Sequence, residues 1–248
     1  MSTPRLSLRL LGAPSLEGSA SATALLAQPK RFALLAWLAA AQPEGLQRRD
    51  RALLLFWPDH EASAARNALR QSLYAIRGAI GDDVIVARGD DEIGIDRTVV
   101  RCDVSAFHDA IEAGHLARAL ELYRGDLLDG LHVRAAGFER WLEAERARLL
   151  ELAGAAAWQL AERYEHGDDL TAASRWAKKA ARLARADERR VRRVIRLLDR
   201  AGDRAGAVKV YEEFASFLRR ELDVEPSDET RTLIESVRAG TVSGAPPD

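Results

Sequence analysis

The stretch ASAARNALRQSLYAIRGAI, residues 62–80, decides the fold. At about 100° per residue in an α-helix, its larger apolar side chains fall within a sector of roughly 60°. The stretch contains no acidic residue. We therefore expect one amphipathic helix with an apolar core face and a cationic, amide-bearing outer face. The core residues are Leu69, Leu73, Ile76 and Ile80.

The outer face of this expected helix has the residue types that read DNA bases. Arginine donates twice to guanine, asparagine and glutamine form paired bonds with adenine, and a helix fits a major groove about 12 Å wide. On the helix alone, a solvated surface rich in arginine remains an alternative. The candidates for base reading are Arg66, Asn67, Arg70, Gln71, Tyr74 and Arg77.

The segments flanking this helix predict a winged helix-turn-helix. Short apolar runs broken by glycine and proline in residues 6–27 are typical of small strands and turns. Helical spacing follows from Pro29 to Ala41 and from about Arg48 to Phe56. Two β-like runs around Gly89 predict a hairpin. This order of strands, three helices and a hairpin assigns a winged-helix DNA-binding domain to residues 1–100.

Basic residues around the expected reader helix are candidates for phosphate contact. Such contacts add salt-dependent affinity without carrying sequence information. Three acidic residues at the hairpin tip, Asp90, Asp91 and Glu92, oppose insertion of the hairpin into the minor groove. The phosphate candidates are Lys30, Arg31, Arg48, Arg49, Arg51 and Arg88.

The second half of the chain predicts a helical array. From Asp103 onward, the strand pattern gives way to amphipathic helices separated by Gly-Asp or Gly-His turns. Gly167 and Gly202 are 35 positions apart, close to the unit of about 34 residues in tetratricopeptide (TPR) repeats. Residues 101–239 are therefore expected to form a TPR-like domain. Residues 240–248, with glycines and paired prolines, are expected to be a disordered tail or a linker.

An internal repeat aligns Gly114, Gly167 and Gly202 as equivalent turn residues. Each is followed five positions later by an alanine and nine positions later by an aromatic residue. The small alanine lets paired helices approach closely, and the aromatic residue fills the space between units. The alanines are Ala119, Ala172 and Ala207, and the aromatic residues are Tyr123, Trp176 and Tyr211.

The composition limits which partners the protein can bind and where in the cell it can work. The formal net charge is −1, so any nucleic-acid surface must be a local patch. The arginine-rich stretch of residues 182–200 favours a solvated face over a partner surface. The longest apolar runs are too short to cross a membrane, no secretory signal is evident, and Cys102 is the only cysteine. We therefore expect a cytoplasmic protein.

Neither catalysis nor a cofactor or bound metal is expected. The five histidines show no ligand spacing with Cys102, and the sequence has no phosphate-cradling glycine loop or nucleophile elbow. No catalytic residue is therefore assigned. The strongest alternative to a DNA-binding protein is a TPR-type scaffold that binds proteins or peptides without direct DNA binding.

Three segments of the chain carry recognisable family motifs. They are Trp57-Pro58-Asp59 with Ala65 to Gln71, Leu122 to Leu131 with Trp141 to Arg146, and Glu221-Leu222 with Val224 to Ser227. Together they resemble the bacterial transcriptional activator domain (BTAD) regulators related to the Streptomyces antibiotic regulatory protein (SARP) family. The resemblance covers nearly the whole chain.

This resemblance implies an OmpR-like winged helix followed by a helical domain used in dimerisation or regulation. It places residues 62–80 in the major groove of double-stranded promoter DNA and turns the preceding segment toward RNA polymerase. The candidates for polymerase contact are Asp59, His60 and Glu61. We thus expect a mainly α protein with a small β component. It would act on the bacterial nucleoid as a sequence-specific transcriptional activator and a homodimer through its helical domain.

Overall fold

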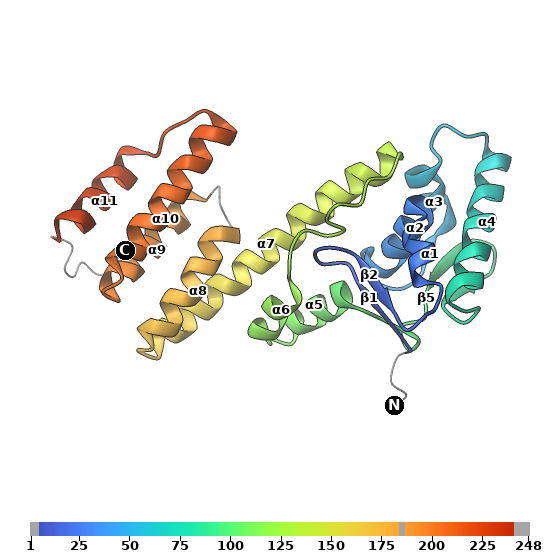
Figure 1. Ribbon diagram of the computed structural model, residues 1–248, viewed down its shortest axis with the longest axis horizontal. Coiled ribbons are helices and arrows are strands. Elements are labelled where there is room, and N and C mark those ends of the chain that lie inside the picture. Colours follow the sequence, from blue (N-terminus) through green and yellow to red (C-terminus); the bar gives the residue numbers. More distant parts are fainter. Residues whose placement is uncertain (1–4, 184–186, 241–248) are drawn as a thin grey trace. The chain divides into compact units, whose positions relative to one another are not determined.

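The computed structural model describes residues 5–183 and 187–240 (Figure 1). The chain is mainly α-helical with two small sheets, as the sequence predicts. It divides into two compact units, residues 1–149 and the residues from Leu150 onward. The predicted domain boundary between residues 100 and 101 stays a prediction. None of the described helices is both long and apolar enough to span a membrane.

Two three-stranded sheets lie in the first unit. The strands are β1 (Leu6–Arg9), β2 (Ser15–Glu17), β3 (Gln47–Arg48), β4 (Ile85–Arg88), β5 (Glu92–Ile95) and β6 (Val100–Cys102). One sheet has the order β2-β1-β6, with β1 antiparallel to β2 and parallel to β6. The other sheet is antiparallel with the order β3-β5-β4. The predicted hairpin β4–β5 therefore has a third strand, β3, which lies directly before the helix that begins at Arg49.

Four helices lie between these strands. They are α1 (Ala22–Leu26), α2 (Pro29–Ala40), α3 (Arg49–Phe56) and α4 (Ala62–Ile80). Pro29 stands at the start of α2, where its missing N–H removes no intrahelical bond. The last helix has the predicted bounds and ends at Gly81, whose φ of 119° favours glycine. Helix α1 is not predicted from the sequence, which indicates strands and turns in this segment.

The first unit continues through two short helices into a long one. These are α5 (Asp103–Glu112), α6 (Leu116–Leu122) and α7 (Ala136–His166). The Asp103 carboxylate accepts the backbone N–H groups of Leu10 and Leu11 at 2.8 and 3.1 Å. Partial burial raises the pKa of this carboxyl, and the hydrogen bonds lower it by less, so its pKa lies above the usual value. The bonds hold the start of α5 to the segment that follows β1.

An aromatic cluster packs the start of α7 against the winged helix. Trp37 of α2 meets Phe56 of α3 edge to face, with 6.2 Å between ring centroids. Phe56 in turn stacks on Phe138 of α7 at 5.0 Å. A Cβ on Gly137 would lie 2.8 Å from the Leu54 carbonyl oxygen, so glycine is required for this close approach. The first turns of α7 are therefore part of the winged-helix core.

The second unit is an array of antiparallel helices. Beyond the end of α7 these are α8 (Leu170–Leu183), α9 (Glu188–Arg200), α10 (Arg204–Phe217), the π-helix η1 (Leu218–Leu222) and α11 (Asp228–Ala239). Helix α9 packs on α8 and α10, and α11 packs on α10 and α9. The Asp187 and Asp203 carboxylates cap α9 and α10 by accepting backbone N–H groups at 2.9 Å.

The sequence repeat is present with a shift of one residue in its middle copy. The turn residues with positive φ are Gly114, Asp168 and Gly202, at 70°, 58° and 76°. Asp168 therefore takes the position that the sequence assigns to Gly167. Asp168 and Gly202 are 34 positions apart, which is the TPR period.

The buried alanines confirm this shift. Ala119, Ala173 and Ala207 follow the three turn residues by five positions, and all three are fully buried. The predicted equivalence of Gly167, Ala172 and Trp176 to the other copies is thus wrong by one residue. The reason is that aspartate tolerates the left-handed conformation that otherwise identifies glycine.

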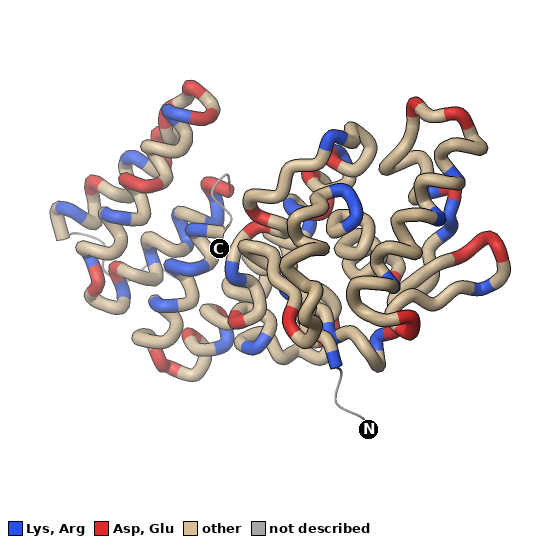
Figure 2. Tube along the Cα trace, turned by 45° about the vertical axis from the view of Figure 1, so that its right-hand side comes forward, with Lys and Arg blue, Asp and Glu red and all other residues tan. Residues whose placement is uncertain are grey.

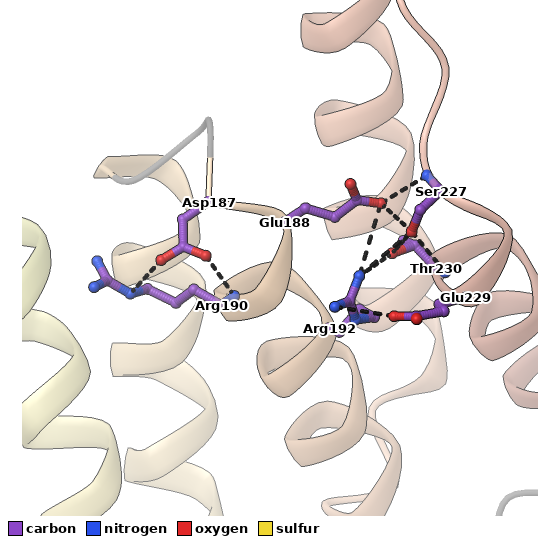
Figure 3. Close-up of polar contacts among 7 residues, drawn as sticks. All are labelled: Asp187, Glu188, Arg190, Arg192, Ser227, Glu229 and Thr230. Atoms are coloured by element: carbon purple, nitrogen blue, oxygen red, sulfur yellow. Dashed lines mark hydrogen bonds and ion pairs between the residues drawn. The ribbon is translucent and has the colours of Figure 1, made fainter.

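A polar network fastens α11 to α9 (Figure 3). The Glu188 carboxylate accepts the backbone N–H and the hydroxyl of Ser227, both at 2.8 Å. Arg192 donates to the Thr230 hydroxyl at 3.1 Å and pairs with Glu229 at 3.2 Å. Because Thr230 is fully buried, the network satisfies a hydroxyl that water does not reach. The segment before α11 is therefore held by α9.

Candidate nucleic-acid interface

Helix α4 buries the face that the sequence predicts. The predicted core residues Leu69, Leu73, Ile76 and Ile80 are all buried, and Ala65 and Ser72 complete the face. The Ser72 hydroxyl donates to the Ala68 carbonyl at 2.8 Å, so it leaves no unsatisfied group in the core. The exposed residues on the other side of the helix are free to contact a partner.

Five of the six predicted base readers are exposed. Within the described residues, none of the five side chains takes part in a hydrogen bond, an ion pair or a ring contact. Tyr74 exposes 79% of its surface, so both its ring and its hydroxyl are open to solvent. The five are Arg66, Asn67, Arg70, Gln71 and Tyr74. Their donors and acceptors remain available for bonds outside the chain.

Arg77 has a different place. Its guanidinium donates to the Ile85 carbonyl of β4 at 3.1 Å, and the residue is half-buried. The bond joins the C-terminal part of α4 to the hairpin. Arg77 is therefore positioned to hold the hairpin, although the sequence groups it with the base readers.

One exposed residue on the same side of α4 is missing from the sequence-based set. At about 100° per residue, Ser63 lies between Arg70 and Tyr74 on the helical wheel. It is exposed in the first turn of α4. A helical-wheel projection of the sequence could have identified Ser63. It was missed because Ser63 lies between two alanines, which indicate no binding surface.

The phosphate candidates fall into two groups, of which the first has side chains held by contacts within the chain. Arg51 donates to the Gln42 carbonyl at 3.2 Å and to the Gln47 side chain at 2.9 Å, so it has a structural role. Lys30 lies over the Trp57 ring, 4.9 Å from its centroid, and partial burial lowers the pKa of its ammonium group.

The other four phosphate candidates lie at the surface or partly so. Arg31 bonds to the Gln28 side chain, Arg48 pairs with Asp50 at 3.4 Å, and Arg88 pairs with Glu92. These are exposed ion pairs and bonds of small energetic value, so phosphate can compete for the arginines. The Nε atom of Arg49 is buried without a hydrogen-bond partner among the described residues.

The hairpin tip is acidic and held in place. Figure 2 shows it as a red bend with one blue segment beside it. Asp90 and Asp91 are exposed, and their side chains have no ion-pair partner in the described part of the chain. The Asp91 carbonyl accepts the Arg49 backbone N–H at 2.8 Å, which fixes the tip beside the start of α3.

The turn between α3 and α4 presents the predicted polymerase residues. Asp59, His60 and Glu61 are all exposed, and the loop that holds them contains red segments in Figure 2. The His60 backbone N–H donates to the Trp57 carbonyl at 3.3 Å, and the indole of Trp57 is buried. The turn therefore projects its polar side chains from a fixed base.

The arginine-rich stretch of the second unit is mostly engaged in internal pairs. Arg193 pairs with Glu162 at 2.8 Å and lies over the Trp158 ring at 4.5 Å. Arg190, Arg192 and Arg200 also have carboxylate partners. Arg189 and Arg196 are exposed and unpaired in the described ranges, whereas Arg185 lies outside the described residues. Most of these arginines therefore contribute to the fold, whereas the sequence predicts a solvated face.

The second part of the chain matches a known family of domains. The bacterial transcriptional activator domain model matches residues 102–238. The chain belongs to this family. The predicted resemblance to BTAD regulators is thereby confirmed.

A solved structure supports the fold over nearly the whole chain. The structure of Mycobacterium tuberculosis EmbR in complex with a low-affinity phosphopeptide matches with a TM-score of 0.60 and 22% identity. The match covers 97% of this BTAD chain and 66% of the EmbR chain. It confirms a winged helix-turn-helix followed by a TPR-like helical domain. No curated protein matches the chain.

Proposed function

We propose that this BTAD protein is a sequence-specific, DNA-binding activator of transcription that reads promoter DNA with α4. The observation that carries the proposal is the set of exposed, unpartnered side chains on that helix, with no acid among them. A helix of this kind fits the major groove and offers the donors that guanine and adenine require. Membership of a family of transcriptional activators makes a regulatory role the natural context.

The remaining parts have supporting roles in this proposal. Lys30, Arg31, Arg48, Arg49 and Arg88 contact phosphates, whereas Arg51 positions the α3 start and Arg77 positions the hairpin. Asp59, His60 and Glu61 contact RNA polymerase. The TPR-like helices mediate homodimerisation or control by a signal. The protein works in the bacterial cytoplasm on the nucleoid, without catalysis, cofactor or metal.

Salt-dependent binding tests the proposal. The full chain is titrated into a fluorescent duplex of random sequence at several salt concentrations. Because phosphate contacts release counterions, we expect the logarithm of the binding constant to fall linearly with the logarithm of the salt concentration. Absence of binding at low salt would contradict the proposal.

A TPR-type scaffold that binds proteins is the second candidate. A groove of about 590 Å³ in the second unit favours it. Val210, Phe214 and Phe217 provide apolar lining, and Lys209 and Glu213 lie at the same groove. A scaffold without a DNA role would show no salt-dependent DNA affinity, so the same titration separates the two functions.

A further inference from the structure

The exposed side of α4 has two edges of different chemistry. With Arg66 at zero and about 100° per residue, Arg70 lies at about 40° on the helical wheel. Asn67 and Gln71 lie at about 100° and 140°. We call Arg66 and Arg70 the cationic row, and Asn67 and Gln71 the amide row. All four side chains are exposed.

Two further residues mark the line between the rows. Ser63 and Tyr74 lie at about 60° and 80° by the same geometry, and both are exposed. When this midline faces the floor of a major groove and the helix runs along the groove, the rows flank it. Each row then faces the bases of a different strand.

The hydrogen-bonding capacities of the rows differ. A guanidinium only donates, so the cationic row requires two acceptors, which guanine offers at O6 and N7. A carboxamide donates and accepts, which matches N7 and the N6 amino group of adenine. The rows therefore select different purines.

We infer that the preferred half-site has guanine on one strand and adenine on the opposite strand, within the same few base pairs. Read along one strand, guanine lies close to thymine. Residues four positions apart in a helix are about 6 Å apart along its axis, so contacts along one row are about two base pairs apart. This inference rests on the proposed function and specifies the DNA that it acts on.

The test begins with selection of bound duplexes from a random-sequence pool by the full chain. Each guanine in the selected half-site is then replaced by 7-deazaguanine, and each adenine by 7-deazaadenine, one strand at a time. These analogues lack the N7 acceptor and keep Watson–Crick pairing. We expect affinity to fall about five- to ten-fold for guanines on one strand only and for adenines on the other strand only.

Two variants assign the rows. Arg70→Ala is expected to lose sensitivity to 7-deazaguanine at one guanine and to keep sensitivity to 7-deazaadenine, whereas Asn67→Ala loses sensitivity at one adenine and keeps sensitivity to 7-deazaguanine. Both side chains are exposed and unpartnered in the described structure, so both variants should fold. Arg196→Ala on α9 is the matched control and should retain both sensitivities.

The outcomes separate this inference from the proposed function. Sensitive guanines and adenines on the same strand, or equal loss of both sensitivities in each variant, overturn the two-row assignment while DNA reading by α4 stands. Failure of the full chain to enrich any sequence contradicts the proposed function and the inference with it.

Discussion

Helices α4 and α9 both have an apolar core face and several arginines, yet they use those arginines differently. On α4, Arg66 and Arg70 have no partner among the described residues. On α9, Arg192 and Arg193 pair with carboxylates of neighbouring helices. The difference teaches that partnering, more than the number of charges, separates a binding surface from a structural one.

The surrounding acids explain this difference. Helix α4 contains no acidic residue, and no carboxylate of the described residues pairs with Arg66 or Arg70. Helix α9 faces Glu162 and Glu165 of α7 and Glu229 of α11. An arginine with a nearby carboxylate contributes to the fold, whereas an arginine without one remains available for phosphate or guanine.

The largest expected effect is on DNA affinity at α4. Arg66→Ala combined with Arg70→Ala removes two candidate guanine contacts, each worth about 1–3 kcal/mol of discrimination. We expect specific affinity, measured by fluorescence anisotropy, to fall on the order of 100-fold or more with little change in thermal stability. Arg189→Ala with Arg196→Ala makes the same charge change on α9 and should alter affinity much less. Equal losses in the two pairs would remove the distinction between the helices.

The next effect concerns stability at α9. Arg192→Ala removes the guanidinium bond to the buried Thr230 hydroxyl and the pair with Glu229. We expect the free energy of unfolding in urea to fall by about 2 kcal/mol, with DNA affinity unchanged. Arg196→Ala, which removes an unpaired arginine from the same helix, should be neutral. A stable Arg192→Ala protein would show that the network in Figure 3 does not hold α11.

A smaller effect is expected at the hairpin tip. Asp90→Asn with Asp91→Asn removes two negative charges that oppose the DNA backbone. Repulsion of this kind in a water-like dielectric corresponds to roughly a five-fold change in affinity at low salt. Affinity for random DNA should therefore rise, and the gain should shrink at high salt. Glu151→Gln with Glu235→Gln is the charge-matched control, and a tip variant that binds no better than this control would exclude any influence of the tip.

The smallest effect is a pH dependence at Glu188. Partial burial would raise the pKa of this carboxyl, but hydrogen bonds from Thr230 and Ser227 and the charge of Arg192 outweigh burial and hold the pKa below its usual 4.5. A depressed pKa stabilises the fold above the unfolded value, and the contribution is lost as pH falls through the folded value.

Glu188→Gln should accordingly be less stable than the parent at pH 7, and the difference should narrow below about pH 4.5. Urea unfolding at both pH values measures it. Glu235→Gln, at an exposed and unpaired position of α11, provides the control. A gap that stays constant with pH would mean that the carboxylate form is not what the network stabilises.

The sequence predicts helix α4 well because its apolar period is long and uninterrupted. The bounds of α4 and its four core residues all follow from that period. The short strands β3 and β6 escape prediction because two or three residues carry no period of their own. They form only where β5 and β1 supply a partner.

The roles of single arginines are harder to predict. The sequence groups Arg77 with Arg70, but its bond to the Ile85 carbonyl depends on where the hairpin folds back. The pairs of α9 likewise depend on acids at distant positions, such as Glu162 and Glu229. Local spacing identifies the face of a helix, whereas the fold decides which of its charges remain free.

The ratio of specific to non-specific DNA affinity tests the central claim most directly. The full chain is titrated with a duplex selected from a random pool and with a scrambled duplex of the same composition, at one physiological salt concentration. The account predicts a ratio of roughly 10³ or more, which collapses in the Arg66→Ala, Arg70→Ala protein and persists in the Arg189→Ala, Arg196→Ala protein. A ratio near one, or a ratio that depends on the α9 arginines, would contradict it.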